Sequence, residues 1–278
     1  MEHLIDPRLL QQRVHVHLVG VGGNGAQMAA RLARLDIAMR ALGHPEGLRV
    51  TAWDPDEVSE ANVGRQLYGP SDVGLNKAVL TVHRLNLFYG LDWTAVPARY
   101  EPMTRPSEAT LVVSCVDSRS ARRELHIATR GVCYWLDLGN TESTAQVVLG
   151  QPQGRAWDEK TFGPRLPVVT DLYPEILDAS VPDDNEPSCS VRMSLASQGL
   201  FVNDAVVTFA CQLLYQLFSQ GRLSVHGAVI NLYTFRTAPI EVKAEVWRRF
   251  GYPAQSPSPA KRLDSRAGKR GRARAAAV

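Results

Sequence analysis

A short apolar strand that runs into a glycine-rich turn and then a helix is the feature that most constrains this chain. Residues 15–19 form the apolar run, and residues 26–35 have helical composition. The turn between them contains Gly20, Gly22, Gly23 and Gly25. Such a turn brings backbone N–H groups and a helix N-terminus up to a phosphate. The sequence therefore predicts an α/β fold with a Rossmann-like nucleotide-binding domain, and the turn alone fits NAD, FAD or ATP.

A second predicted strand, residues 48–53, ends at Asp54, and Asp56 follows closely. In Rossmann-like units an acid at this place hydrogen-bonds the ribose hydroxyls. Further polar residues come next, namely Asn62, Arg65, Gln66 and Lys77. Cations over a triphosphate neutralise the charge that develops as pyrophosphate leaves. This spacing favours adenylate chemistry, and an NAD-dependent oxidoreductase is the alternative in which these residues have no role.

In order and spacing, these residues resemble the ThiF, MoeB and ubiquitin-activating E1 superfamily. The resemblance covers GVGGNG, the DPD pair, the N-x-x-R-Q element, the lysine that follows and the apolar run LVVSCVDS, which carries Asp117. It implies a mixed β-sheet flanked by helices, with ATP held by the glycine turn and its ribose by Asp54. Phosphate contacts are implied for Asn62, Arg65, Gln66 and Lys77. Asp117 is implied to lie near Mg²⁺ and the α-phosphate, so the catalytic set includes Arg65, Lys77 and Asp117.

Two later stretches are similar to ThiF-like proteins of bacterial PRTRC cassettes. They are YWLDLGN at residues 134–140 and PSCS at residues 187–190. The superfamily resemblance implies ATP-dependent adenylation of the C-terminal carboxylate of a small β-grasp, ubiquitin-like protein. Two alternatives stay open: an E1-like enzyme that acts on a small molecule or a tRNA, and a noncatalytic ATP-binding dimeric scaffold.

Residues 1–250 are predicted to form one adenylation domain, in which residues 151–190 are a crossover loop. A polar, proline-rich stretch of this length is uncommon in a compact domain and is usually functional. The resemblance implies that the loop crosses the nucleotide pocket and that Cys189 lies where relatives carry the cysteine that accepts the acyl group. Cys189 is either a thioester-forming nucleophile or an unreactive residue of a loop that covers ATP.

The remaining cysteines predict no metal centre. The chain has four cysteines and no CxxC pair, so it lacks the thiolate set of a structural zinc site, and we expect no zinc. Cys115, Cys133 and Cys211 lie in apolar runs and are predicted to be small buried residues.

The apolar stretch at residues 194–220 has roughly helical spacing on more than one face. Burial in the core or in a dimer interface explains that pattern, and the resemblance implies a homodimer. Residues 228–237 and 240–246 are predicted strands. Arg119, Arg122 and Arg123 begin another helix and are predicted to form a solvated face, with phosphate contact as the alternative.

The C-terminal residues 251–278 form a predicted disordered tail with seven basic residues against Asp264. Such a tail either stays solvated or makes weak contacts with nucleic acid. The chain has no apolar run of membrane-spanning length and no secretory signal pattern at its start. These features predict a cytoplasmic protein that does not enter the membrane.

Overall fold

The computed structural model describes residues 1–101, 109–181 and 199–253. An eight-stranded sheet with the strand order β10-β9-β7-β6-β5-β2-β3-β4 forms its centre. These strands are β2 (Val14–Val19), β3 (Leu48–Trp53), β4 (Thr94–Val96), β5 (Leu111–Ser114), β6 (Tyr134–Asn140), β7 (Thr144–Gly150), β9 (Val225–Asn231) and β10 (Arg236–Glu241). A small second sheet pairs β1 (His3–Leu4) with β8 (Arg222–Leu223).

The helices lie between and beside these strands. The α-helices are α1 (Gly23–Ala41), α2 (Lys77–Tyr89), α3 (Arg119–Ala128), α4 (Glu159–Phe162), α5 (Val169–Leu172), α7 (Val202–Gln220) and α8 (Ala244–Arg248). The 3-10 helices are η1 (Pro7–Leu10), η2 (Glu60–Asn62), η3 (Pro70–Asp72) and η4 (Pro174–Leu177). None of the described helices is long and apolar enough to cross a membrane.

The central sheet has a parallel half and an antiparallel half. The strands from β4 through β3, β2 and β5 to β6 run parallel, whereas β7, β9 and β10 extend the sheet antiparallel. Helices connect the parallel strands, because a parallel pair needs a crossover, while β6–β7 and β9–β10 are joined by short turns. The structure confirms the predicted α/β fold with a mixed sheet flanked by helices.

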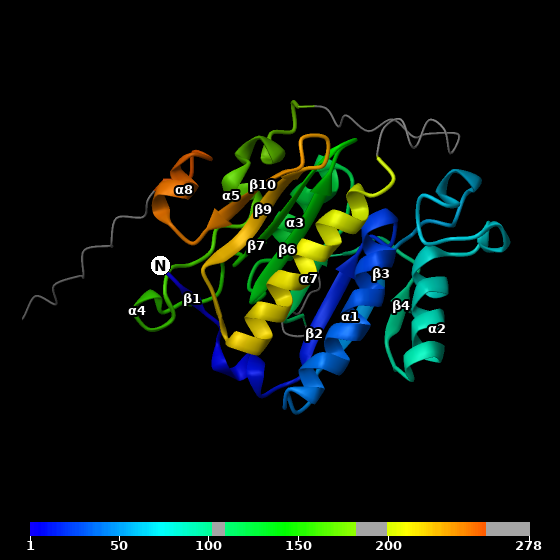
Figure 1. Cartoon of the computed structure of the whole chain (residues 1–278), viewed down its shortest axis with the longest axis horizontal. Coiled ribbons are helices and arrows are strands. Elements are labelled where there is room, and N and C mark those ends of the chain that lie inside the picture. Colours follow the sequence, from blue (N-terminus) through cyan, green and yellow to red (C-terminus); the bar gives the residue numbers. More distant parts are fainter. Residues whose placement is uncertain (102–108, 182–198, 254–278) are drawn as a thin grey trace, which may run out of the picture.

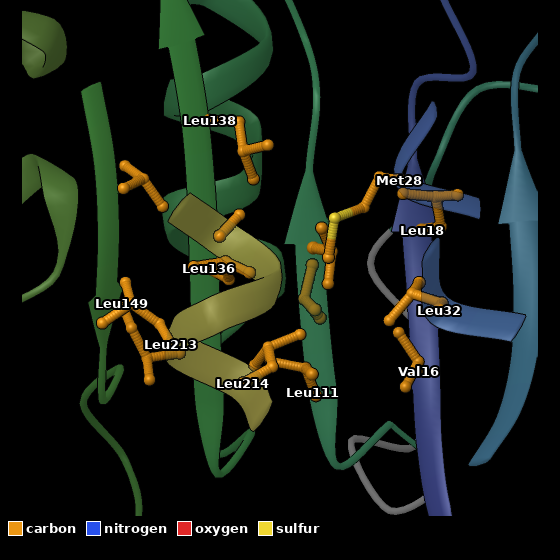
Figure 2. Close-up of a cluster of buried hydrophobic side chains, with 14 of the residues drawn as sticks. Val16, Leu18, Met28, Leu32, Leu111, Leu136, Leu138, Leu149, Leu213 and Leu214 are labelled. Carbon is orange, nitrogen blue, oxygen red and sulfur yellow. The ribbon is translucent and has the colours of Figure 1, made fainter. Parts of the chain in front are cut away.

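The helices α1 and α7 lie side by side on one face of the sheet, and α3 lies on the other face (Figure 1). Under α1 and α7 the apolar side chains of β2, β5, β6 and β7 form a continuous core (Figure 2). Leu18, Leu136 and Leu214 are completely buried there. Burial of one such side chain stabilises the fold by about 1.5–3 kcal/mol, so α7 is held by the core.

The predicted elements match the structure best where the chain alternates between strand and helix. β3 has the predicted bounds, and β2 begins one residue earlier than expected. The helix expected at residues 26–35 continues to Ala41, where Arg40 pairs with Asp36 one turn earlier at 3.0 Å. The strand expected at residues 228–237 is wrong, because the chain turns after Asn231 and returns as β10.

The described part of the predicted crossover loop differs from the expectation. Residues 151–181 form α4, α5 and η4 and do not line the nucleotide cavity described below. Leu166, Val169 and Leu172 are almost fully buried, with α5 against β7 and η4 against α3. These apolar residues follow no regular period, which explains why the sequence reads as a loop. Residues 182–190, the remainder of that loop, lie outside the described residues.

Acid is expected to destabilise the fold through His226, which is completely buried. Its Nε2 accepts the indole N–H of Trp247 at 2.8 Å, so Nδ1 carries the proton and donates to the Leu149 carbonyl at 2.8 Å. Burial lowers the pKa of His226 from 6.5 to about 4. Between these values the unfolded chain binds a proton that the folded chain does not, so stability falls with falling pH by about 1.4 kcal/mol per pH unit.

Urea unfolding at about pH 7.5 and about pH 5 measures this slope. Burial also lowers the pKa of His3 to about 4, so His226→Gln should remove about half of the histidine contribution. His83→Gln, at an exposed position of α2, serves as the control and should leave the slope unchanged. An unaltered slope in His226→Gln would contradict the assignment.

Candidate functional site

The largest concentration of predicted site residues lies where β2, β3 and β5 end. The chain passes from β2 to β3 on one side and later forms β5 on the other side of β2. Ligands bind at such switch points in open α/β sheets. A cavity of about 330 Å³ lies there. Its wall includes Gly20, Gly22, Gly23, Asn24, Trp53, Asp54, Asp56, Arg65, Gln66, Lys77, Arg99, Tyr100, Asp117, Arg122, Asn140 and Asn203.

The glycine turn shapes the floor of this cavity. Gly20 has φ +85°, which L side chains rarely adopt. A Cβ on Gly25 would overlap the carbonyl oxygen of Gly20, and one on Gly23 would lie 2.5 Å from Asn203 Nδ2. Gly22 has ordinary space, with Gln66 Nε2 at 3.7 Å from such an atom. Gly20 is therefore required by its backbone conformation, and Gly23 and Gly25 by the close approach of neighbouring atoms. Gly25 packs behind the turn and does not line the cavity.

This difference predicts losses of stability of different size for two alanine substitutions. Gly25→Ala is expected to lower the free energy of unfolding by about 2–3 kcal/mol, because helix α1 must move away from the turn to relieve the overlap. Gly22→Ala is the matched control and should cost less than about 1 kcal/mol. Chemical denaturation of both variants measures the difference. Equal stabilities would show that Gly25 has no packing role.

Asp54 organises the turn as well as lining the cavity. Its Oδ2 accepts the backbone N–H of Val21 at 2.6 Å, and its Oδ1 accepts that of Asp56 at 2.8 Å. Burial raises the pKa of the Asp54 carboxyl, and these two N–H donors oppose the rise. Each carboxylate oxygen keeps a further lone pair, so the side chain can still accept a ribose hydroxyl.

Positive charge enters the cavity from two elements. Lys77, the first residue of α2, is 8 % exposed and places Nζ 3.2 Å from Asp56 Oδ2. Arg65 follows η2, where burial lowers the pKa of its guanidinium and the negative charge of Asp117 opposes this. Arginine stays protonated at any physiological pH. The structure therefore brings Arg65, Lys77 and Asp117 to one cavity, although up to 52 residues separate them in sequence.

Two predicted site residues, Asn62 and Gly25, do not line this cavity in the described structure. Asn62 Oδ1 accepts the backbone N–H of Ser59 at 2.9 Å, so its side chain caps η2. Gly25 packs behind the turn. Cys189 lies outside the described residues. Direct phosphate contact by Asn62 and thioester formation on Cys189 stay predictions.

Several cavity residues have no site role that the sequence patterns assign. Trp53 and Tyr100 pack edge to face with ring centroids 5.4 Å apart, and Arg99 adjoins them. Asn140 and Asn203 come from β6 and α7, which are far from the glycine turn in sequence. Only the tertiary fold brings these residues to the site.

Arg122 corrects the expected solvated face of α3. It is 8 % exposed, and its Nε lies 3.1 Å from both carboxylate oxygens of buried Asp137. Its Nη2 donates to the Val116 carbonyl at 2.8 Å and to the Leu138 carbonyl at 3.1 Å. Asp137 also accepts the Ser114 hydroxyl at 2.6 Å. Arg122 therefore ties β6 to the backbone next to Asp117.

The three described cysteines are free thiols, of which Cys133 is buried and Cys115 and Cys211 are half-buried against the core. Burial raises the pKa of Cys115 and Cys133, and raises that of Cys211 to about 12. Thiols of this kind are poor nucleophiles at neutral pH. Cys133 is buried as predicted, whereas Cys115 and Cys211 are half-buried and Cys115 lines the cavity.

The site combines a glycine turn, a helix N-terminus and acids at strand ends, all at the switch point of the sheet. This combination is typical of Rossmann-like nucleotide-binding proteins. Residues 8–244 match the ThiF family, and the chain belongs to this family. No curated protein sequence matches the chain. The resemblance to PRTRC proteins stays a prediction.

Solved structures share the fold. PaaA is similar with a TM-score of 0.53 and 15 % identity over 84 % of this chain and 65 % of PaaA. MccB from E. coli is similar with a TM-score of 0.52 and 14 % identity over 84 % of this chain and 63 % of MccB. The structure of E. coli MccB with ATP gives the same TM-score and identity, over 84 % and 64 %. The chain spans less than two thirds of each neighbour, and at these identities the likeness shows the ThiF/E1-like fold.

Proposed function

We propose that this chain binds ATP in the cavity and adenylates a carboxylate. The carrying observation is that one cavity contains the glycine turn, Asp54, Arg65, Lys77 and Asp117. A dehydrogenase has no use for cations at these positions, whereas adenylation must stabilise a departing pyrophosphate. The structure of MccB with ATP supports nucleotide binding by this fold.

The turn and Asp54 orient the nucleotide in this proposal. The N-terminus of α1 directs N–H groups to the phosphates, and Asp54 accepts the ribose hydroxyls. Arg65 and Lys77 neutralise the outer phosphates. Trp53 and Tyr100 supply an aromatic wall for the base.

The donor set fits Mg²⁺ that arrives with the nucleotide. The described residues contain no group of three or more His, Cys, Asp or Glu side chains that could hold a metal by themselves. Mg²⁺ is usually bound through one or two carboxylates together with phosphate oxygens and water, and Asp117 is the carboxylate suited to that role. When bound, the ion would withdraw charge from the phosphates and make the α-phosphorus more electrophilic.

The acyl substrate would approach from a second cavity of about 340 Å³, which shares Asp117, Arg122 and Asn140 with the first. A carboxylate oxygen attacks the α-phosphorus, the bond from that phosphorus to the bridging oxygen breaks, and pyrophosphate leaves with the electron pair. Arg65 and Lys77 stabilise the charge on the departing group. The products are an acyl-adenylate and pyrophosphate.

We propose the C-terminal carboxylate of a small β-grasp, ubiquitin-like protein as the substrate, with a homodimer as the working form. Transfer of the acyl group to Cys189 would follow adenylation. An E1-like enzyme that acts on a small molecule or a tRNA is the alternative within the same chemistry. A dimeric ATP-binding scaffold that contacts nucleic acid through residues 251–278 is the noncatalytic alternative.

ATP–pyrophosphate exchange by the purified protein tests the function. The assay is run with and without a small β-grasp protein encoded beside this chain. Exchange that requires the partner supports the proposal, and exchange without it favours a small-molecule substrate in the preparation. If folded protein binds ATP but shows no ATP–pyrophosphate exchange with any candidate substrate, only the noncatalytic scaffold remains.

A further inference from the structure

Four side-chain amides surround the N-terminus of α1, and we call them the amide cluster. Asn24 lies in the first turn of α1, Gln66 follows η2, Asn140 ends β6, and Asn203 lies in the first turn of α7. All four line the cavity. Asn24 Nδ2 donates to Asn140 Oδ1 at 2.7 Å, which joins two of them.

Three members of the amide cluster are buried, and each of the four has one polar atom without a partner among the described residues. Asn203, Asn24 and Gln66 are 1 %, 7 % and 8 % exposed. In the described part of the chain, no hydrogen-bond partner exists for Asn24 Oδ1, Gln66 Oε1, Asn140 Nδ2 or Asn203 Nδ2. An unsatisfied buried polar group is costly and rare in native proteins. Asn140 Nδ2 and Asn203 Nδ2 are donors that need an acceptor, whereas Asn24 Oδ1 and Gln66 Oε1 are acceptors. The two donors therefore indicate a ligand that carries hydrogen-bond acceptors.

Two of the amides flank the glycine turn. Asn203 Nδ2 is 2.5 Å from the position that a Cβ of Gly23 would take, and Gln66 Nε2 is 3.7 Å from that of Gly22. An anion held by the N-terminus of α1 thus lies within reach of both amides. Asn140 and Asn203 each present an Nδ2 donor, and Gln66 can present its NH₂ group by rotation about its terminal bond. The cluster can thus supply three neutral donors, while Asn24 keeps Asn140 in place through their hydrogen bond.

The expected position of the ribose on Asp54 indicates which phosphate lies at the glycine turn. Asp54 accepts the N–H of Val21, the residue directly before Gly22, so a ribose on Asp54 lies beside the turn. The phosphate attached to that ribose is the α-phosphate, and the outer phosphates extend toward Arg65 and Lys77. We propose, resting on the proposed function, that the amide cluster binds the α-phosphate and leaves the outer phosphates to the two cations.

This division predicts different nucleotide preferences in two variants. Asn203→Ala removes a donor to a group that AMP and ATP share, so both nucleotides should bind about tenfold more weakly. Lys77→Ala removes a cation that only the outer phosphates meet, so ATP should bind about tenfold more weakly while AMP affinity stays unchanged. Isothermal titration calorimetry with AMP and with ATP measures both ratios.

Gln27→Ala is the matched control. Gln27 is a 6 % exposed amide of α1 whose Nε2 donates to Asp204 of α7 at 3.1 Å, outside the cavity wall. Its loss should leave both affinities unchanged. Thermal unfolding shows whether each variant is folded. Asn203→Asp, which keeps the size of the side chain and adds a charge, should bind both nucleotides more weakly than Asn203→Ala.

The outcomes separate the two proposals. Wild-type protein that is folded and binds neither nucleotide would remove the proposed function and this inference with it. If Asn203→Ala and Asn203→Asp bind AMP and ATP as tightly as the wild type does, only the inferred role of the amide cluster is wrong. A loss confined to ATP in Asn203→Ala would also overturn it, because the amide would then serve the outer phosphates.

Discussion

Lys77→Ala is expected to reduce ATP–pyrophosphate exchange at least about 100-fold while the protein stays folded. The Lys77 ammonium lies in the cavity wall, 3.2 Å from Asp56. Its charge stabilises the departing pyrophosphate more than it stabilises bound ATP, so the exchange rate falls further than the affinity does. Exchange rates and calorimetric affinities of the same preparation measure the two effects.

Lys243→Ala is the matched control, because it removes a paired lysine that lies outside the cavity. Lys243 also pairs with a carboxylate, that of Glu241 at 3.0 Å, but the pair is exposed and outside the cavity. Its exchange rate should equal that of the wild type. Asp117→Ala should behave like Lys77→Ala, and full exchange in both cavity variants would remove the proposed mechanism.

Breaking the buried pair of Arg122 and Asp137 is expected to destabilise the fold by about 3–5 kcal/mol. Asp137→Ala leaves the Arg122 side chain, which is 10 % exposed, without its carboxylate partner, and it also removes the acceptor of the Ser114 hydroxyl. The main cost is an uncompensated buried charge. Urea unfolding measures the loss in Arg122→Ala and in Asp137→Ala.

The double variant Arg122→Met and Asp137→Leu tests the physical cause. Because it leaves no unpaired charge, it should recover much of the stability. Glu245→Ala is the surface control, since Glu245 and Arg248 are 69 % and 57 % exposed and their pair contributes less than about 1 kcal/mol. A loss in the double variant as large as in Asp137→Ala would indicate that packing, and not charge, dominates.

The sequence predicted the part of the fold in which local patterns and long-range packing agree. The strand that ends at Val19, the glycine turn and the strand that ends at Trp53 each have a local pattern that the structure reproduces. The strand-end position of Asp54 and Asp117 follows from these patterns, since parallel strands present their carboxyl ends at one edge. The cavity was therefore foreseeable, and Gly20, Gly22, Asp54, Arg65 and Lys77 do line it.

The packing of residues 151–177 was not foreseeable from periodicity. Val169 and Leu172 lie on the four-residue helix α5, and Leu166 lies in the irregular segment before it. All three are buried, and α5 packs against β7. The expectation that Arg122 is solvated is wrong because its partner is also distant in sequence. Its partner Asp137 lies in an otherwise apolar strand, and only the parallel pairing of β5 and β6 brings that carboxylate within reach of α3.

By itself, the sequence determined the α/β class, the nucleotide-binding turn and the residues at the ends of the first strands, because each depends on neighbours a few positions away. Only the tertiary structure decided which side chains complete the cavity. Asn140 and Asn203 reach the glycine turn from β6 and α7, more than 100 residues away in sequence. Such positions depend on strand order and helix packing, which no local pattern encodes.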